Sequence, residues 1–460
     1  MKAMQRWLGL CVLGMFFFMV VVDGSIVTIA VPTMARALHV GTASVNLVIS
    51  VYLITISALL LPFGQLGDRI GRTRLFQMGT AGFVIGSWLA GATNELSVVL
   101  IGRVIQAVGA SMTMATSYAV VTDLFPPEQL GRAFGIESIF LSLGALAGPG
   151  LGGLILANWG WREIFWVNVP IGFVCLVISF WTLPKNVSHV QKARFDWLGV
   201  LGLLILASLF YGVSLLAGSQ LVLAVVGLVV IGLVLWDWLR IEKHQSAPLF
   251  DATLLTHGQV ARLLLTSFLS FIAAYAFVLL APIYLQLVVH LDSQVTGLVL
   301  MAGPLSALVA NPLAGILVDH WGQNKLLRIG MAIMLVAQLG LVALSGIGEP
   351  WWLIMWSVLS VIGTALFTTA ANTKIMTGVT AEHRGAIGAL NSLAREVGMM
   401  LGVSVASGIY YGILSQAAGK TVTNALNQSL SQLIFAQRGV YLVASILLGV
   451  ALWQLCRRAK

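Results

Sequence analysis

Residues 64–74 read Gly-Gln-Leu-Gly-Asp-Arg-Ile-Gly-Arg-Thr-Arg and separate two long apolar runs. Gly64 and Gly71 allow close helix approach and a sharp reversal of the chain. Asp68, Arg69 and Arg72 have to stay hydrated or paired near the lipid headgroups. The stretch therefore predicts a short, tightly turned loop at a membrane surface.

A related stretch returns 251 positions later, where residues 315–325 read Gly-Ile-Leu-Val-Asp-His-Trp-Gly-Gln-Asn-Lys. The first glycine, the aspartate, the second glycine and the terminal base stay in register, so Asp319 aligns with Asp68. A single copy would fit an ordinary basic loop equally well. Recurrence after the second apolar run of each half instead indicates an internal duplication.

The composition is that of a polytopic membrane protein. Of 460 residues, 59% are hydrophobic and 9% are charged, whereas a soluble domain has roughly 25% charged residues. The net charge of +9 is scattered between apolar runs, so we expect no nucleic-acid partner. No phosphate-binding loop or catalytic cluster is present, so we expect no ATP, no metal or other cofactor and no enzymatic activity.

Apolar runs of about 20 residues, the length that crosses a bilayer as a helix, predict fourteen spans. They lie near 8–31, 44–66, 75–93, 97–121, 132–156, 164–183, 197–217, 220–239, 262–289, 296–318, 326–346, 351–373, 385–413 and 433–455. With this count, nineteen Lys and Arg residues fall on the side of the termini and four fall opposite. This bias predicts a cell-membrane protein with both termini in the cytoplasm.

The duplication accounts for six spans in each half and leaves two over. We therefore expect an N-terminal six-helix bundle over 1–183 and a C-terminal one over 262–460. The residues between them, 184–261, would hold cytoplasmic linkers around an inserted transmembrane hairpin at about 197–239.

Residues 64–74 resemble the loop between the second and third spans of the major facilitator superfamily. Further stretches extend this resemblance to the fourteen-span drug:proton antiporter branch. They are Asp-Gly-Ser-Ile-Val-Thr-Ile-Ala-Val-Pro at 23–32, Trp-Arg-Glu-Ile-Phe-Trp-Val-Asn-Val-Pro-Ile-Gly at 161–172, Asp-Trp-Leu-Gly at 196–199 and Pro-Ile-Tyr-Leu-Gln at 282–286. The resemblance implies an all-α major facilitator fold, with two repeated six-helix bundles around a midplane site.

Asp23 and Arg103 are ionisable residues inside predicted spans, about eight and six residues from the outer ends of those spans and so at similar depths. Intramembrane charges are costly and are functional candidates by default. One hypothesis is a static pair that joins two helices. In the other, Asp23 exchanges a proton for a cationic or polar substrate while Arg103 tunes its pKa. The resemblance implies proton coupling for this acid and for Arg103-Val-Ile-Gln106, although Ala107 stands where the family pattern has glycine.

The span at 132–156 contains Gly144, Gly148, Pro149, Gly152 and Gly153. Small residues four apart allow close helix packing, and proline introduces a kink. The segment is either a packing seam or a bending gate. It resembles the fifth-span motif of antiporters in the superfamily, which favours export.

Three further charged residues are candidates within spans. Glu137 either faces headgroups or is a second acid in an inward-open cavity. Arg395 lies near the midplane of the span at 385–413, on one face with Asn391 and Gly398. The adjacent Glu396 points about 100° away, so pairing with Arg395 is not assumed.

The family resemblance also implies contacts for the loop at 64–74. Asp68 should meet the inner end of a helix from the second half. Arg72 should meet an acid at the end of the fourth span, where Asp123 is the candidate. Such charge pairs would hold the cytoplasmic side shut in one state and break in the other.

The leading functional hypothesis is a proton-coupled secondary exporter that works by alternating access. Its substrates would be lipophilic compounds, cationic or neutral amphiphilic, such as drugs, and its other partners protons and the bilayer. An exporter of one specific metabolite, peptide or lipid is the alternative. A non-transporting sensor or scaffold is a third possibility, but it has no need of Asp23 and Arg103. We expect a monomer.

Overall fold

The structure is a computed structural model. It describes the chain apart from residues 1–2, 41, 185–195, 217–220, 244–257, 292, 345–349, 420–421, 423–424, 426–427 and 458–460. The expected linkers on either side of the inserted hairpin fall largely on 185–195 and 244–257, outside the described residues.

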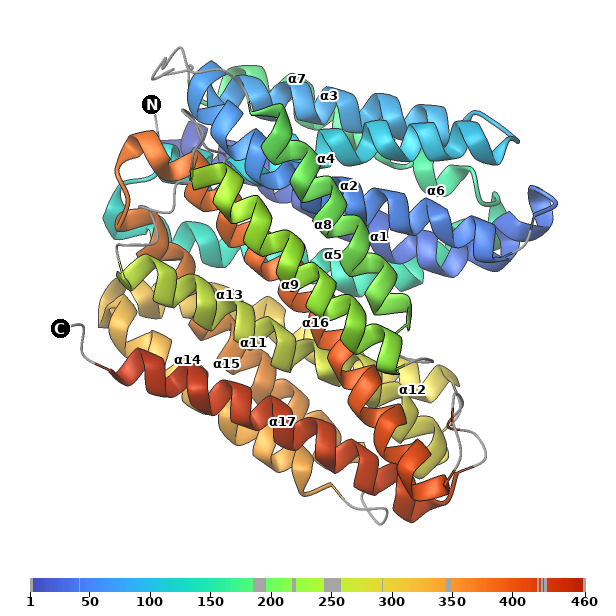
Figure 1. The fold of residues 1–460 in the computed structure, drawn as a ribbon. Helices are drawn as coiled ribbons and strands as arrows, with labels where there is room; N and C mark the ends of the chain where they lie inside the picture. Colours follow the sequence, from blue (N-terminus) through green and yellow to red (C-terminus); the bar gives the residue numbers. More distant parts are fainter. Residues whose placement is uncertain are drawn as a thin grey trace. The chain divides into compact units, whose positions relative to one another are not determined.

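The described chain is almost entirely helical (Figure 1). In the first half the helices are α1 (Ala3–Ala37), α2 (Thr42–Ile70), α3 (Arg72–Gly91), α4 (Leu96–Leu124), α5 (Leu130–Asn158), α6 (Glu163–Trp166) and α7 (Asn168–Thr182). The inserted hairpin consists of α8 (Trp197–Leu216) and α9 (Leu221–Lys243). The second half contains α11 (Gly258–Ile283), a π-helical turn (Tyr284–Val288), α12 (Ser293–Leu300), α13 (Ala302–Trp321), α14 (Gln323–Val342), α15 (Pro350–Thr377), α16 (Arg384–Ala418) and α17 (Leu430–Cys456).

Eleven helices among the described residues are long and apolar enough to cross a membrane, so the expected count of fourteen is not confirmed. Helices do occupy the three remaining positions, as α3, α8 and α9. Arg74 and Gln77 fall within every 18-residue stretch of α3 and lower its mean hydropathy. In α8 and α9 the described apolar stretches are shorter, Leu198–Leu209 and Val229–Trp238.

The helices group into two compact units. Unit 1 comprises Met1–Ala207, Trp238–Asp251 and Ile375–Leu393, and unit 2 comprises Ser208–Asp237, Ala252–Lys374 and Ala394–Lys460. The first turns of α16 therefore belong to unit 1 and the remainder of that helix to unit 2. The domain boundaries expected from the sequence remain a prediction.

In unit 1, α3 packs along α4, α1 along α5 and α2 along α4 (Figure 1). Glycine makes the α3–α4 contact possible, because a Cβ at Gly79 would lie 2.7 Å from the carbonyl oxygen of Gly109. Close backbone approach of this kind replaces the hydrophobic effect as the packing force between helices in lipid.

Unit 2 contains an equivalent close contact between two helices at glycine. A Cβ at Gly330 of α14 would lie 2.7 Å from the carbonyl oxygen of Gly363 of α15. Gly330 follows Gly79 by 251 positions, the same step that relates the two loop motifs. The packing of α3 on α4 and of α14 on α15 thus preserves the duplication read from the sequence.

The two loop motifs form equivalent turns. Gly71 between α2 and α3 has φ 103°, and Gly322 between α13 and α14 has φ 82°. Both values lie in the region that glycine adopts without steric cost. The glycine retained in both copies therefore makes the reversal between helices possible.

Candidate functional site

Asp23 of α1 lies at the centre of a buried polar network within unit 1. Its side chain is fully buried, and Arg103 Nη1 lies 2.6 Å from its Oδ2. Gln106 Nε2 and Asn168 Nδ2 each donate to Oδ1 at 2.9 Å. Three donors from α4 and α7 thus satisfy both carboxylate oxygens, which is how a buried charge becomes tolerable.

Arg103 also contacts several groups other than Asp23. Its Nε donates to the carbonyl oxygen of Val48 at 3.1 Å, and its Nη1 donates to Gln106 Oε1 at 2.7 Å. The guanidinium carbon lies 3.9 Å from the centre of the Tyr52 ring, within cation–π range. Arg103 therefore has a defined position that does not depend on Asp23 alone.

The expected pair between Asp23 and Arg103 is present, but the network also contains residues that the sequence interpretation did not select. Gln106 was noted only as part of a motif, and it also donates to Ser87 Oγ at 2.8 Å. Its spacing of three from Arg103 places both on one helix face and was an available signal. Asn168 was likewise noted only as part of the stretch at 161–172 that carries the family resemblance.

No oxygen of Asp23 is open to a substrate in this conformation, because the residue is 1% exposed. Direct exchange between a proton and a bound cation at Asp23 would first require the network to break. In this conformation both oxygens of Asp23 are occupied by protein donors.

The repeat relates this site to an uncharged position in unit 2. Gly148 of α5 lies against Val22 of α1, and Gly402 of α16 lies against Ile272 of α11. The step of 250 positions from Val22 to Ile272 takes Asp23 to Ala273. The carbonyl oxygen of Ala273 accepts from Gln338 at 3.0 Å. At this position the duplication has kept the packing, and only unit 1 carries the acid.

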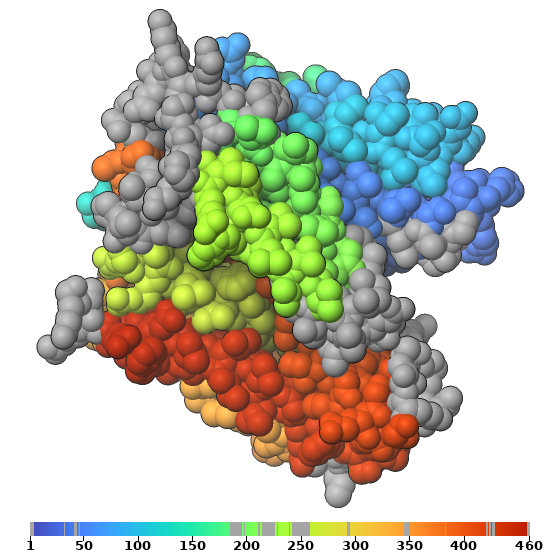
Figure 2. All heavy atoms as spheres, in the orientation of Figure 1, coloured from blue at the N-terminus to red at the C-terminus, as the bar shows by residue number. Residues whose placement is uncertain are grey.

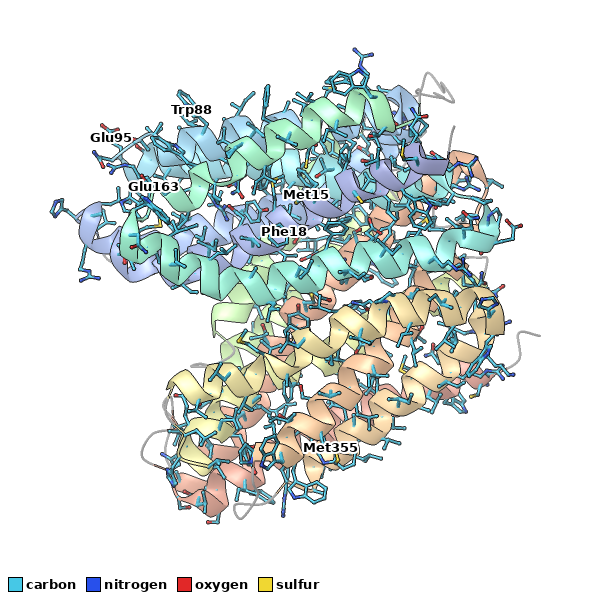
Figure 3. The ribbon with its side chains drawn as sticks, turned by 180° about the vertical axis from the view of Figure 1, so that it is seen from behind. Met15, Phe18, Trp88, Glu95, Glu163 and Met355 are labelled. Carbon is cyan, nitrogen blue, oxygen red and sulfur yellow. The ribbon has the colours of Figure 1, made fainter. Side chains whose placement is uncertain are left out.

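Three of the candidate glycines of α5 pack against α1, the helix that carries Asp23. A Cβ at Gly144 would lie 3.0 Å from the carbonyl oxygen of Phe18, which Figure 3 labels on α1 beside α5. A Cβ at Gly148 would overlap Ser25, and one at Gly152 would lie 3.2 Å from Ile26.

The other two candidates in this segment differ from these three glycines. A Cβ at Gly153 would meet nothing within 4 Å. Pro149 lies within the helix, but the placement of its side chain is not described. Three of the four candidate glycines therefore form a seam between α5 and α1.

Glu137 of α5 is also buried within unit 1. It is 2% exposed, and it accepts a hydrogen bond from Ser117 Oγ of α4 at 3.0 Å. This burial does not match the alternative in which Glu137 faces the headgroups.

In unit 2, Arg395 and Glu396 form an ion pair at 3.1 Å, with side chains 13% and 17% exposed. The long side chains reach each other although their helical positions diverge, which the sequence interpretation did not assume. In the repeat, Gly402 corresponds to Gly148. The same difference in residue number makes Asn391, which is buried, the counterpart of Glu137.

The loop at 64–74 makes the contacts that the resemblance implied. Asp68 Oδ1 accepts from Gly385 N at 3.0 Å, and Asp68 Oδ2 accepts from Ala386 N at 3.1 Å. Asp68 thus caps the first turn of α16, where the N-terminal end of the helix dipole favours a negative charge. Gly64 makes room for this contact, since a Cβ there would lie 2.7 Å from the carbonyl oxygen of Gly385.

Arg72 links the loop to α4. Its Nη1 lies 2.8 Å from Asp123 Oδ2, and its Nη2 lies 2.7 Å from Asp68 Oδ1. Burial lowers the pKa of Arg72, but the two carboxylates outweigh burial and the net pKa is raised, so the guanidinium stays charged. Arg384 Nη1 also reaches Asp123, at 3.3 Å.

The remaining loop candidates are Arg69 and Asp319. Arg69 lies half-buried in the last turn of α2 and Asp319 half-buried in the last turns of α13. Within the part of the chain that the structure describes, no group of three or more His, Cys, Asp or Glu side chains is placed to hold a metal ion.

Comparisons with known proteins agree with this arrangement. A family model described as the Major Facilitator Superfamily matches residues 12–403. The chain is similar to the riboflavin transporter RibZ of Clostridioides difficile, with 30% identity over 411 residues covering 88% of each protein. It is also similar to the multidrug resistance protein Stp of Mycobacterium tuberculosis, with 29% identity over 438 residues covering 94% of this chain and 80% of Stp.

Among solved structures, the crystal structure of the human organic anion transporter MFSD10 resembles this chain with a TM-score of 0.67. The identity is 16%, and the match covers 99% of this chain and 100% of that one. At this identity the likeness concerns the fold alone.

Proposed function

This chain belongs to the Major Facilitator Superfamily, and we propose that it is a proton-coupled exporter of lipophilic compounds. Its fold is the all-α major facilitator fold expected from the sequence. It is a multi-pass membrane transporter and not an enzyme. The proton as coupling ion, the direction of transport, the monomeric state and the cytoplasmic termini are parts of the proposal.

The buried network around Asp23 is the observation that carries proton coupling. Asp23 is a carboxylate in the interior of a membrane bundle, and its charge is balanced by Arg103 at 2.6 Å. A scaffold would not need such a pair, because an apolar pair of similar volume is often as stable or more stable.

Protonation of Asp23 would remove the charge attraction between Asp23 of α1 and Arg103 of α4. Arg103 would keep the Val48 carbonyl, Gln106 and the Tyr52 ring as partners. The guanidinium thus has a resting position in both protonation states, and only its bond to α1 changes. A proton at Asp23 therefore changes which helices are held together.

The seam between α1 and α5 would carry this change to the rest of the bundle. Gly144 and Gly148 place the α5 backbone against the part of α1 on either side of Asp23. We propose that α1 and α5 move against each other along this seam when Asp23 is protonated. In secondary transporters alternating access comes largely from one repeat moving against the other, and this shift within the first bundle would bias that movement.

The contact between α2 and α16 is proposed as the cytoplasmic gate. Asp68 caps α16 with two charge-assisted hydrogen bonds, and such bonds break as a unit when the helices separate. Arg72 and Asp123 would hold the loop in place while α16 moves.

Two substrate classes have support. The similarity to the multidrug resistance protein Stp over 94% of this chain favours lipophilic drugs. The similarity to the riboflavin transporter RibZ favours one specific metabolite as the second candidate. The seam glycines resemble an antiporter motif, which favours export for either substrate class.

The test is transport into everted membrane vesicles with an imposed pH gradient, acidic inside. A cationic dye, a neutral dye and riboflavin are the probes. We expect Asp23→Asn to abolish proton-driven uptake, most severely for the cationic dye, while Asp23→Glu retains part of it. Uptake of all probes against their gradients by Asp23→Asn would place coupling elsewhere, with Glu137 and Glu396 next.

Asp237→Asn is the matched control, because Asp237 is exposed at the end of α9. It should transport at the normal rate. Transport of riboflavin alone would select the second candidate function.

A further inference from the structure

At one end of the inserted hairpin, a specific contact joins α8 to α9. Asp196 Oδ1 accepts from Gly199 N at 2.9 Å and caps the first turn of α8. The carbonyl oxygen of the same Gly199 accepts from Trp238 Nε1 of α9 at 3.0 Å. The start of α8 and the end of α9 are therefore joined through one residue.

Trp238 is inserted into this contact and does not merely touch it. It is 7% exposed, in contrast to Trp236, which is 58% exposed two positions earlier. A Cβ at Gly202 would overlap the Trp238 ring, so only glycine leaves room for the indole there. Figure 2 shows α8 and α9, in green, on the surface of the molecule.

The buried face at this end of the hairpin packs on two helices of the proposed gate. Val200 and Leu203 of α8 form one apolar cluster with Trp238 and with Ala58 and Leu61 of α2. Leu390 of α16 packs against the same cluster.

The members of this cluster lie close to the gate along both helices. Leu61 precedes Gly64 by three residues, and Leu390 follows Gly385 by five. At Gly64 and Gly385 the backbones of α2 and α16 are in close contact, since a Cβ at Gly385 would lie 2.6 Å from the carbonyl oxygen of Gly64. The cluster therefore touches both sides of the contact that Asp68 caps.

We infer that the inserted hairpin braces the closed contact between α2 and α16, with Trp238 as its positioning residue. Separation of α2 from α16 would pull Leu61 and Leu390 apart, and the hairpin could remain packed on only one of them. The hairpin thus adds a stabilising contact that exists in one state of the gate. This inference goes beyond proton coupling and substrate choice, although it rests on the proposed gate.

A buried position on α16 can report the gate without any substrate. Ser392 is 0% exposed and follows Gly385 by seven residues, which places it on the same helix face. Ser392→Cys is a nearly isosteric change. The native Cys11, Cys175 and Cys456 would first be replaced by serine.

The measurement is the rate at which a membrane-permeant maleimide labels Ser392→Cys in vesicles without a pH gradient. Trp238→Ala should raise this rate about fivefold or more, the size expected when one hydrogen bond and its packing are lost. Gly202→Val should act in the same direction, because it displaces an intact indole. Trp236→Ala should leave the rate unchanged.

Trp238→Phe keeps most of the ring and removes only the N–H donor, so it tests the inference if Trp238→Ala fails to insert. It should raise the labelling rate less than Gly202→Val does. If Trp238→Phe and Gly202→Val were both labelled no faster than the protein with the intact hairpin contact, the inference that the hairpin braces the gate would be overturned. Because labelling needs no substrate or proton gradient, failure here is distinguishable from failure of the proposed antiport.

Discussion

Replacing both Asp23 and Arg103 should destabilise the protein less than replacing either residue alone. Asp23→Asn keeps an oxygen at Oδ1, where Gln106 and Asn168 donate. It places an amide N–H₂ at Oδ2, where Arg103 Nη1 lies at 2.6 Å. Two donors then face each other, and the buried guanidinium loses its counter-charge.

The magnitude follows from the burial of both groups, which are 1% and 0% exposed at the side chain. Breaking a buried ion pair from one side costs about 3–5 kcal/mol. The double variant Asp23→Asn, Arg103→Gln holds no charge and loses only hydrogen bonds, each worth about 1 kcal/mol. We therefore expect a coupling free energy of at least about 2 kcal/mol between the two sites.

The assay is a double-mutant cycle on the free energy of unfolding in mixed micelles, with transport measured on the same four proteins. The double variant should recover much of the stability lost in Asp23→Asn. It should still fail to couple transport to the pH gradient, because no titratable group remains. This combination separates a static pair from a proton site.

Two results would refute the reasoning. Single effects that add within about 0.5 kcal/mol would mean that the two charges do not stabilise each other. Normal proton-driven transport by a stable double variant would mean that the pair only joins helices.

The other predictions concern the gate, the seam and the topology. Asp68→Asn should lower transport at least severalfold, because it removes the charge that caps α16. The protein should stay inserted and abundant. Transport at the normal rate would mean that the loop is only a topology signal. Gly148→Val should destabilise the protein by about 1–3 kcal/mol through overlap with α1, whereas Gly153→Ala, with nothing within 4 Å, should change thermal stability little. Equal effects would contradict the seam. Reporter fusions should place Lys460 in the cytoplasm and residues 417–432 outside, and an outside signal at the C-terminus would overturn the fourteen-span topology.

The residue types and their positions along the chain were enough to predict the membrane class, the duplication and the loop. Lipid requires long apolar helices, so composition and run length decide the class. Gly71 and Gly322 recur because a sharp reversal needs positive φ, and this is a local requirement that a sequence displays. Asp23 and Arg103 stand out because charged residues are rare in apolar runs.

The tertiary structure was needed for every partner contributed by another helix. Asn168 joins Asp23 across 145 positions, and Gly385 joins Asp68 across 317. Neither distance follows from helix periodicity, because periodicity determines only which residues share a face. The same limit explains why Arg395 and Glu396 pair although their helical positions diverge, and why Gly148 and Gly153 differ although both are glycines. Which face a helix buries, and against which neighbour, depends on packing between segments far apart in the chain.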